Sequence, residues 1–404
     1  MNPCLRRADK PPHWALFAYF CVAFFLTSCA GPTDQGRVSL NPGAPSPTKV
    51  LESDSGVYRG NIQRTGEYAA TGPSQLHGLG WKYTRELSSD VLISSLAVTV
   101  AGVYFVTSDG SLHQLDVTTG KQQWQDRSYG ATPTVANGIV YYGWHGTLYA
   151  ADTTTHRRVW QFPTNDDILS SPAVSNGRIY FGSKDGNLYA VETLTGQLAW
   201  KFKVGDQVIS DPAVSDGIVY IAGSVLLHTP GTDVVDSREQ IYAVDAATGA
   251  QRWTFPTPVS VNKPVVADGM VYCVGYYSNV VYALEAKSGQ QVWQYSPPDG
   301  LGYDAVPVIA NGVLYITGQA TLHAVDLTTR QELWELTTPI AIAPPSIAQG
   351  VLYFGGGDKY LHAVNALTGH EQWRFPTDGA FIQPPVIAAG TVYALTLNSI
   401  YAIR

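Results

Sequence analysis

The sequence repeats one pattern along most of its length, with a period of about 40 residues that is typical of propeller blades or solenoid units. The first mark of the pattern is a tyrosine eight residues after a proline. It occurs seven times, and Leu96–Tyr104 is an eighth copy with leucine in place of proline. The seven proline copies are Pro133–Tyr141, Pro172–Tyr180, Pro212–Tyr220, Pro264–Tyr272, Pro307–Tyr315, Pro345–Tyr353 and Pro385–Tyr393.

Two further marks fix the register of the repeat. An acidic or amide residue follows an aromatic-Ala-apolar triplet in most copies, and a tryptophan stands eight residues beyond it. Seven constant spacings of this kind exclude a chance match and require one structural unit used repeatedly. The pairs are Asp116–Trp124, Asp152–Trp160, Glu192–Trp200, Asp245–Trp253, Glu285–Trp293, Asp326–Trp334 and Asn365–Trp373.

One unit is interpreted as four short strands joined by tight turns. A strand after the proline, a glycine turn, an Ile-Tyr or Val-Tyr strand and a Leu-Tyr-Ala-Val strand precede the tryptophan strand. The last turn has the pattern Asp-x-x-Thr-Gly, in which the carboxylate accepts backbone N–H bonds and glycine adopts a positive φ. His156 and Arg330 replace that glycine. We expect their two turns to be strained or differently shaped.

The two ends of the chain determine the number of blades. The chain ends at Arg404 with three strands of a unit that lacks its tryptophan strand, whereas Gly80–Thr84 matches such a strand at the other end. We therefore predict an all-β, eight-bladed β-propeller of four-stranded antiparallel blades, closed by pairing of the N-terminal strand with the C-terminal blade. The eight structural tryptophans are Trp81, Trp124, Trp160, Trp200, Trp253, Trp293, Trp334 and Trp373.

The N-terminal residues indicate export. Cations precede an apolar run that is shorter than the roughly 20 residues of a membrane-spanning helix, so residues 1–28 are interpreted as a signal peptide. Leu26-Thr27-Ser28-Cys29 resembles the lipobox of bacterial lipoproteins and predicts lipidation of Cys29; an ordinary cleavable signal is the alternative. Residues 29–55 are predicted to be a flexible tether and residues 56–404 the propeller. Cys273 is then expected to be a small core residue.

The repeat Ala-x-Asp-x-x-Thr-Gly-x-x-x-Trp resembles the tryptophan-docking motif of the PQQ-like, or quinoprotein alcohol dehydrogenase-like, propeller family. The resemblance covers roughly residues 56–404, including the lead-in Tyr58-Arg59-Gly60-Asn61. For catalytic members it implies PQQ and calcium on the propeller axis, above a pair of adjacent cysteines. This sequence has no Cys-Cys pair. The closest match in plan is to the non-catalytic outer-membrane assembly lipoproteins of the BamB type.

These observations favour a membrane-tethered, extracytoplasmic protein-binding scaffold, with envelope protein assembly as the leading expectation. We expect no catalytic residues, no cofactor and no metal; a PQQ-dependent dehydrogenase and a carbohydrate-binding or cell-wall-binding propeller are the alternatives. The expected partners are unknown envelope proteins and, through the lipid anchor, the membrane. A net charge of −7 gives no basic face for nucleic acid, which we exclude as a partner.

Several residues could carry function or only packing. His113, His323 and His362 occupy a slot held by tyrosine in other blades, so they are interpreted as packing residues rather than metal ligands. About 13 residues are inserted around Ser224 to Gln240, where we expect a loop outside the repeat. The aromatic residues that depart from the repeat are the predicted partner surface, and they are Trp144, Tyr276 and Tyr277.

Overall fold

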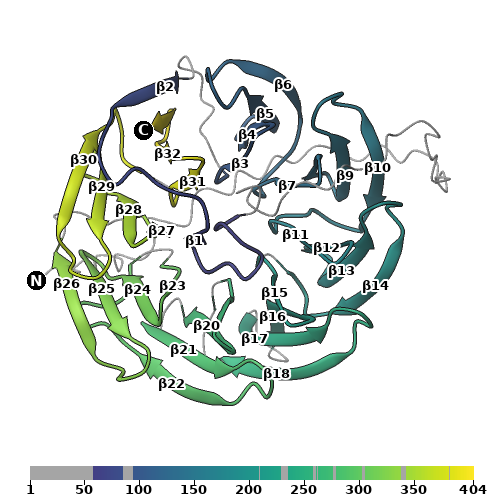
Figure 1. Ribbon diagram of the computed structural model, residues 1–404. Coiled ribbons are helices and arrows are strands. Elements are labelled where there is room, and N and C mark those ends of the chain that lie inside the picture. The colour runs from purple at the N-terminus through teal and green to yellow at the C-terminus, as the bar shows by residue number, and fades with distance from the viewer. Residues whose placement is uncertain are drawn as a thin grey trace, which may run out of the picture. The chain divides into compact units, whose positions relative to one another are not determined.

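The computed structural model describes residues 58–84, 94–208, 210–228, 235–257, 261, 263–275, 279–302, 305–337, 343–381 and 383–404. All regular structure in these ranges is β-strand. Among these residues, no helix is long and apolar enough to span a membrane. The strands form eight sheets, seven with four strands and one with five, placed around a common centre in chain order (Figure 1). The predicted eight-bladed all-β propeller is confirmed.

Each blade has a three-residue inner strand, two longer middle strands and an outer strand, all antiparallel to their neighbours. The inner and middle strands are almost wholly buried, while the outer strands alternate between exposed and partly buried residues. Blades 1 to 4 consist of β3 (Ala97–Thr99), β4 (Gly102–Thr107), β5 (Ser111–Leu115), β6 (Gln122–Arg127); β7 (Thr134–Ala136), β8 (Ile139–Trp144), β9 (Thr147–Asp152), β10 (Arg158–Pro163); β11 (Ala173–Ser175), β12 (Arg178–Gly182), β13 (Asn187–Glu192), β14 (Leu198–Lys203); β15 (Ala213–Ser215), β16 (Ile218–His228), β17 (Val235–Asp245) and β18 (Gln251–Thr257).

The second half of the ring repeats this plan. Blade 7 gains a fifth strand from the N-terminal lead-in, and blade 8 takes its outer strand from there. Blades 5 to 8 consist of β19 (Val265–Ala267), β20 (Met270–Gly275), β21 (Val280–Glu285), β22 (Gln291–Tyr295); β23 (Val308–Ala310), β24 (Val313–Thr317), β25 (Thr321–Asp326), β26 (Glu332–Thr337); β27 (Ser346–Ala348), β28 (Val351–Gly355), β29 (Tyr360–Asn365), β30 (Glu371–Pro376), with β1 (Glu67–Tyr68); and β31 (Val386–Ala388), β32 (Thr391–Leu395), β33 (Ser399–Ile403) and β2 (Leu79–Thr84).

The ring closes as the repeat predicted. Strand β2 pairs antiparallel with β33, with Trp81 opposite Ala402 and Tyr83 opposite Ile400. The first and last parts of the propeller therefore share one sheet, and neither leaves a free strand edge at the junction. In the same way that β14 completes blade 3, β2 completes blade 8.

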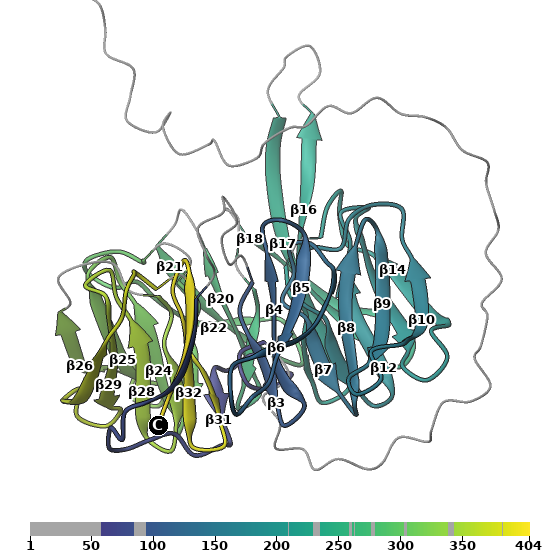
Figure 2. The same ribbon diagram turned by 90° about the horizontal axis from the view of Figure 1, so that it is seen from above.

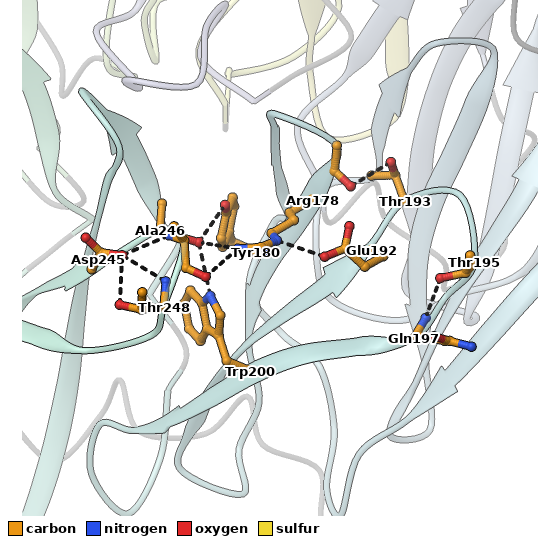
Figure 3. Close-up of polar contacts among 12 residues, drawn as sticks. Arg178, Tyr180, Glu192, Thr193, Thr195, Gln197, Trp200, Asp245, Ala246 and Thr248 are labelled. Carbon is orange, nitrogen blue, oxygen red and sulfur yellow. Dashed lines mark hydrogen bonds and ion pairs between the residues drawn. The ribbon is translucent and has the colours of Figure 1, made fainter.

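Adjacent blades are joined by their tryptophans (Figure 3). The indole Nε1 of Trp200 donates to the carbonyl oxygen of Ala246 in the next blade at 3.0 Å. The ring lies against Gly249, where an added Cβ would come within 2.7 Å of the indole. This turn therefore needs glycine for space as well as for its φ of 75°. The equivalent indole bonds are Trp81 to Val117, Trp160 to Thr193, Trp253 to Ala286, Trp334 to Ala366, and Trp373 to Pro73 of the lead-in.

The two turns that lack glycine keep the shape of the others. His156 and Arg330 have φ values of 60° and 62°, close to the 69–75° of the glycines in the same slot of other blades. Their N–H groups donate to Asp152 O at 2.9 Å and Asp326 O at 2.7 Å, as the glycine N–H groups do elsewhere. We expected these turns to be either strained or differently shaped. They are strained, because a residue with a side chain is unfavourable in the left-handed region of φ. Trp124 stacks directly on the His156 ring, at 5.1 Å between centroids.

The lead-in crosses the centre of the ring, where we call residues 58–68 the axial segment (Figure 1). Its carbonyl oxygens accept hydrogen bonds from inner-strand N–H groups of four successive blades. It then pairs as β1, in parallel, with β27 of blade 7. One short segment therefore bonds to half of the blades in turn. The four bonds are Val214 N to Ile62 O, Val266 N to Gln63 O, Ile309 N to Thr65 O and Ile347 N to Gly66 O, all between 2.8 and 3.0 Å.

Two buried arginines fix the axial segment in place. Arg64 is 0% exposed, and its guanidinium donates only to backbone carbonyls. Burial lowers the pKa of Arg64, against the opposing charge of Asp211. Because three of the carbonyls directly precede the inner strands of blades 3 and 4, the side chain links these two blades through the axis. The acceptors are Pro212, Tyr58, Ser171 and Pro172 for Arg64, and Pro307 and Arg64 for the neighbouring Arg59.

The insertion in blade 4 is a hairpin rather than the loop we expected. Strands β16 and β17 pair without interruption from Ile218–Asp245 to His228–Val235. Paired backbone satisfies its own N–H and C=O groups, so the inserted residues extend the middle strands of the blade instead of looping out of them. Figure 2 shows this hairpin projecting beyond the neighbouring blades.

We expect Gly249→Ala to destabilise the propeller more than Gly217→Ala. Both glycines have a φ near 75°, but an added Cβ meets Trp200 at Gly249 and nothing within 4 Å at Gly217. The difference isolates the clash with the indole, which should cost about 1–3 kcal/mol beyond the shared backbone strain. Urea unfolding of both variants measures it, and equal losses would contradict the docking role of the tryptophan.

Arg64→Met is expected to lower the free energy of unfolding by about 3 kcal/mol or more, because it leaves several buried carbonyls without a donor. Arg252→Met is the matched control, since Arg252 is exposed and its ion pair with Asp245 lies at the surface. The control should lose no more than about 1 kcal/mol. Equal unfolding midpoints in urea for the two variants would show that the axial arginine is dispensable.

Candidate functional site

Trp144 lies at the tip of the hairpin between β8 and β9. His145 and Gly146 turn the chain there with φ values of 42° and 67°, a pair of left-handed residues that matches a two-residue hairpin. The Trp144 ring is partly buried and meets the edge of the His145 ring at 4.1 Å. It also covers Gly110 of the preceding blade, where an added Cβ would lie 2.9 Å from the indole. The aromatic ring thus bridges blades 1 and 2.

A cavity of about 690 Å³ opens beside this ring. Its other walls come from blade 1, from the turn between β4 and β5 and from the end of the outer strand β6. One aromatic face is therefore surrounded by polar and charged groups from two blades. The lining residues are Asp109, Gly110, Ser111, Gln125, Asp126, Arg127 and Trp144.

The charged residues Asp126 and Arg127 at this cavity have different surroundings. The Asp126 carboxylate accepts hydrogen bonds from Arg158 Nη2, at 3.0 Å, and from the hydroxyl of Tyr142, at 2.5 Å. The positive charge of Arg158 therefore offsets the negative charge of Asp126. The Arg127 guanidinium stands 5.9 Å from the Trp144 ring centroid, as a cation over an aromatic face. A cation beside an aromatic face suits a partner that brings an apolar or aromatic side chain together with a carboxylate or carbonyl oxygen.

A second cavity, of about 300 Å³, lies on the axis beside the axial segment. Burial, and then the charge of Asp268, raise the pKa of the Glu67 carboxyl at this cavity. None of the residues that line it is aromatic or cationic. They are Asn61, Gln63, Thr65 and Glu67 of the axial segment and Ser215, Val266, Ala267, Asp268, Ile309, Ala310 and Asn311 of the inner strands and turns.

These axial residues do not fit PQQ, the cofactor that the resemblance implies for catalytic members. PQQ is a flat quinone that carries several carboxylates, so its site needs a planar floor and cationic groups. The axial cavity offers two carboxylic acids and no ring. Cys273, the remaining thiol outside the N-terminal region, is fully buried in blade 5, and burial raises its pKa to about 12. No catalytic step through the cofactor follows from this site.

The other predicted residues are distributed around the ring. His113 and His362 stack on Phe105 and Phe354 with centroids about 5 Å apart, as packing residues would. His323, which is 1% exposed, and His362 are each also hydrogen-bonded to two carboxylates. Cys29, Tyr276 and Tyr277 lie outside the described residues, so Trp144 alone represents the predicted partner surface.

Arg127 and Gln125 are site residues that sequence reasoning missed. They lie on an outer strand, where the repeat fixes the tryptophan and leaves neighbouring positions free. A usable signal was the departure from the repeat, because Trp144 replaces a turn residue of the unit. In the structure its ring packs on Gly110, in the Asp109-Gly110 turn of blade 1. Only the contact between blades brings these side chains to one cavity.

The known proteins to which this chain is similar differ from one another in activity. The family model described as outer membrane protein assembly factor BamB matches residues 144–229, 229–341 and 318–403. The tetrathionate hydrolase of Acidithiobacillus ferrooxidans is 27% identical over 182 residues, which are 38% of this chain and 36% of that protein. The chain thus spans little more than a third, at most, of the length of the curated relatives it matches.

Solved structures share the fold at low identity. BamB from Moraxella catarrhalis superimposes with a TM-score of 0.62 at 16% identity, covering 81% of this chain and 99% of that one. A quinohemoprotein alcohol dehydrogenase from Pseudomonas putida gives a TM-score of 0.67 at 15% identity, covering 87% and 80%. The family model spans well over half of the chain, and the repeat and the eight blades agree with it. This chain belongs to the PQQ-like propeller family, the one whose matching model is described as outer membrane protein assembly factor BamB.

Proposed function

We propose that this chain is a non-catalytic, membrane-tethered scaffold that binds proteins during assembly of the cell envelope. The matching family model and the BamB-like fold support this role, and the Leu26–Cys29 lipobox supports an extracytoplasmic, lipid-anchored location. The alternative activity is that of a dehydrogenase, since such enzymes share the fold. A shared fold does not decide between them, so the choice rests on the sites.

The observation that carries the proposal is the composition of the ring centre. The axial segment bonds to the inner strands there, and the adjoining cavity has acidic and amide walls. A rigid ring whose centre is crossed by its own chain is suited to presenting its outer surfaces to a partner. The Trp144 cavity is the described place on those surfaces where an aromatic ring, a guanidinium and amide or carboxylate groups converge.

Trp144 then serves as the anchor of a partner protein. Tryptophan and arginine together at a concave, partly desolvated site are typical of the few residues that carry most binding energy. Arg127 adds a donor for partner carboxylates or carbonyls, while Asp126 is already balanced by Arg158. The partner should therefore contribute an apolar or aromatic side chain with an acceptor group next to it.

Trp144→Ala is expected to weaken partner binding by about 30-fold, the effect of losing roughly 2 kcal/mol at an interface centre. A photo-crosslinking residue at Gln125, which lines the same cavity, should capture a partner from the native envelope, and Trp144→Ala should remove that product. Leu367→Ala is the control, because Leu367 is 78% exposed on another blade.

Capture that is unchanged by Trp144→Ala would contradict the anchor role. Loss of the crosslinked product upon addition of soluble cell-wall glycan would instead favour the carbohydrate-binding alternative, since aromatic faces beside carboxylates and amides also bind sugars. The thermal unfolding midpoint of each variant shows whether the propeller remains folded.

Reconstitution with PQQ and calcium tests the enzyme alternative directly. We expect the purified chain to retain no cofactor absorbance after gel filtration and to show no alcohol-dependent dye reduction above buffer, because the axial cavity has no ring or cation for the quinone. An authentic quinoprotein alcohol dehydrogenase serves as the positive control. Retained cofactor with turnover would overturn the scaffold proposal.

A further inference from the structure

Three blades carry histidine at one equivalent position on their third strand. His113, His323 and His362 each direct Nδ1 to the residue nine positions later, at the start of the outer strand. That residue is Gln122 in blade 1, Glu332 in blade 6 and Glu371 in blade 7. The backbone setting is therefore the same three times, and the differences among the blades lie in the side chains.

Blade 6 surrounds its histidine with acidic groups. His323 is 1% exposed, and its Nδ1 lies 2.5 Å from a Glu332 oxygen. Its Nε2 lies 2.6 Å from the Thr321 hydroxyl and 3.0 Å from an Asp299 oxygen. Asp299 also accepts from the hydroxyl of Thr321, which holds its carboxylate in place. Glu335 lies on the same strand as Glu332, β26. The ligand atoms of His323, Glu332 and Glu335 all lie within 4.8 Å of one another and form one cluster.

Blade 7 also places two carboxylates, Glu371 and Asp358, on the ring nitrogens of its histidine. The position equivalent to Glu335 is therefore what distinguishes the blades. It is Gln125 in blade 1 and Arg374 in blade 7, where the Arg374 guanidinium lies 3.8 Å from Glu371 and offsets its charge. In blade 6 no lysine or arginine among the described residues forms an ion pair with Asp299, Glu332 or Glu335.

Tyr295 packs beside this cluster. Its ring meets the His323 ring edge-on at 6.4 Å, and its hydroxyl oxygen is buried. One imidazole thus stands among three carboxylates, and no described lysine or arginine is paired with any of the three.

We propose that His323, Glu332 and Glu335 form a binding site for a divalent transition-metal ion of the zinc class. An imidazole nitrogen with carboxylate oxygens is a donor set that zinc takes in proteins, whereas calcium prefers oxygen ligands alone. Asp299 is a positioning residue: together with the Thr321 hydroxyl, which donates to it, it forms the acceptor pair for the Nε2 proton and so fixes the tautomer that leaves the Nδ1 lone pair free for the ion. The ion replaces the proton now shared between His323 and Glu332.

This site is separate from the Trp144 cavity and does not depend on the proposed scaffold function. It would join β25 to β26 at the outer face of blade 6, and three protein ligands leave positions for water or for a carboxylate of a bound partner. Glu335 is the residue that gives blade 6 its third ligand, since blade 7 has Arg374 at the position equivalent to Glu335.

Zinc titration of the full chain, purified without a polyhistidine tag, tests the site. A chelator competition should give a tight zinc site in the wild type that His323→Tyr abolishes. Tyrosine occupies this slot in blades 2 to 5, so this variant should keep its fold. Glu335→Arg, which reproduces blade 7, should abolish the same site, and Asp299→Asn should weaken it by about 10–100-fold.

His362→Tyr is the matched control and should leave zinc affinity unchanged. Zinc binding that is equal in the wild type, His323→Tyr and Glu335→Arg would overturn the proposal, as would the absence of any tight zinc site in the wild type. A site that prefers calcium and is insensitive to His323→Tyr would also overturn it, because the nitrogen ligand would then have no part. Unfolding midpoints within a few degrees of the wild type confirm that each variant is folded.

Discussion

The docking of each outer-strand tryptophan onto the next blade is the contact on which the ring depends. A four-stranded blade buries little surface by itself, so its stability comes from its neighbours. At the junction of blades 3 and 4, one carbonyl accepts from the Trp200 indole, and the ring lies on a glycine that no larger residue could replace without displacing it. Most copies of the repeat keep tryptophan and glycine together for this reason, whereas in blade 2 His156 replaces the glycine and Trp124 stacks on its ring.

The axial segment adds a second connection, from inside the ring. Its backbone bonds to blades 4 to 7, and Arg64 reaches blades 3 and 4 through buried carbonyls. A buried guanidinium is costly unless every donor is used, and here the inward-facing carbonyls of the inner strands provide the acceptors. The same arrangement places the chain's own lead-in across the ring centre, whereas the Trp144 cavity and the His323 cluster lie away from the axial segment.

The accuracy of sequence-based prediction differed between the scaffold and the sites. Spacing alone gave the register, the eight blades and the pairing of Trp81 with the last blade, because these follow from a pattern repeated many times. The insertion was predicted as a loop and is a hairpin, since nothing in one copy shows whether inserted residues pair with each other. Histidine was interpreted as packing in all three blades, and the carboxylates around His323 became evident only from the structure.

By itself, the sequence determined the unit, its number and the closure of the ring, because local turn chemistry and strand periodicity recur at fixed distances along the chain. Tertiary structure decided which side chains meet. Arg64 lies about 100 residues or more from its blade acceptors, and Trp144 meets residues of another blade across a cavity. Such meetings depend on the curvature of the closed ring, which places unrelated positions of different blades side by side, and no spacing within one repeat encodes them.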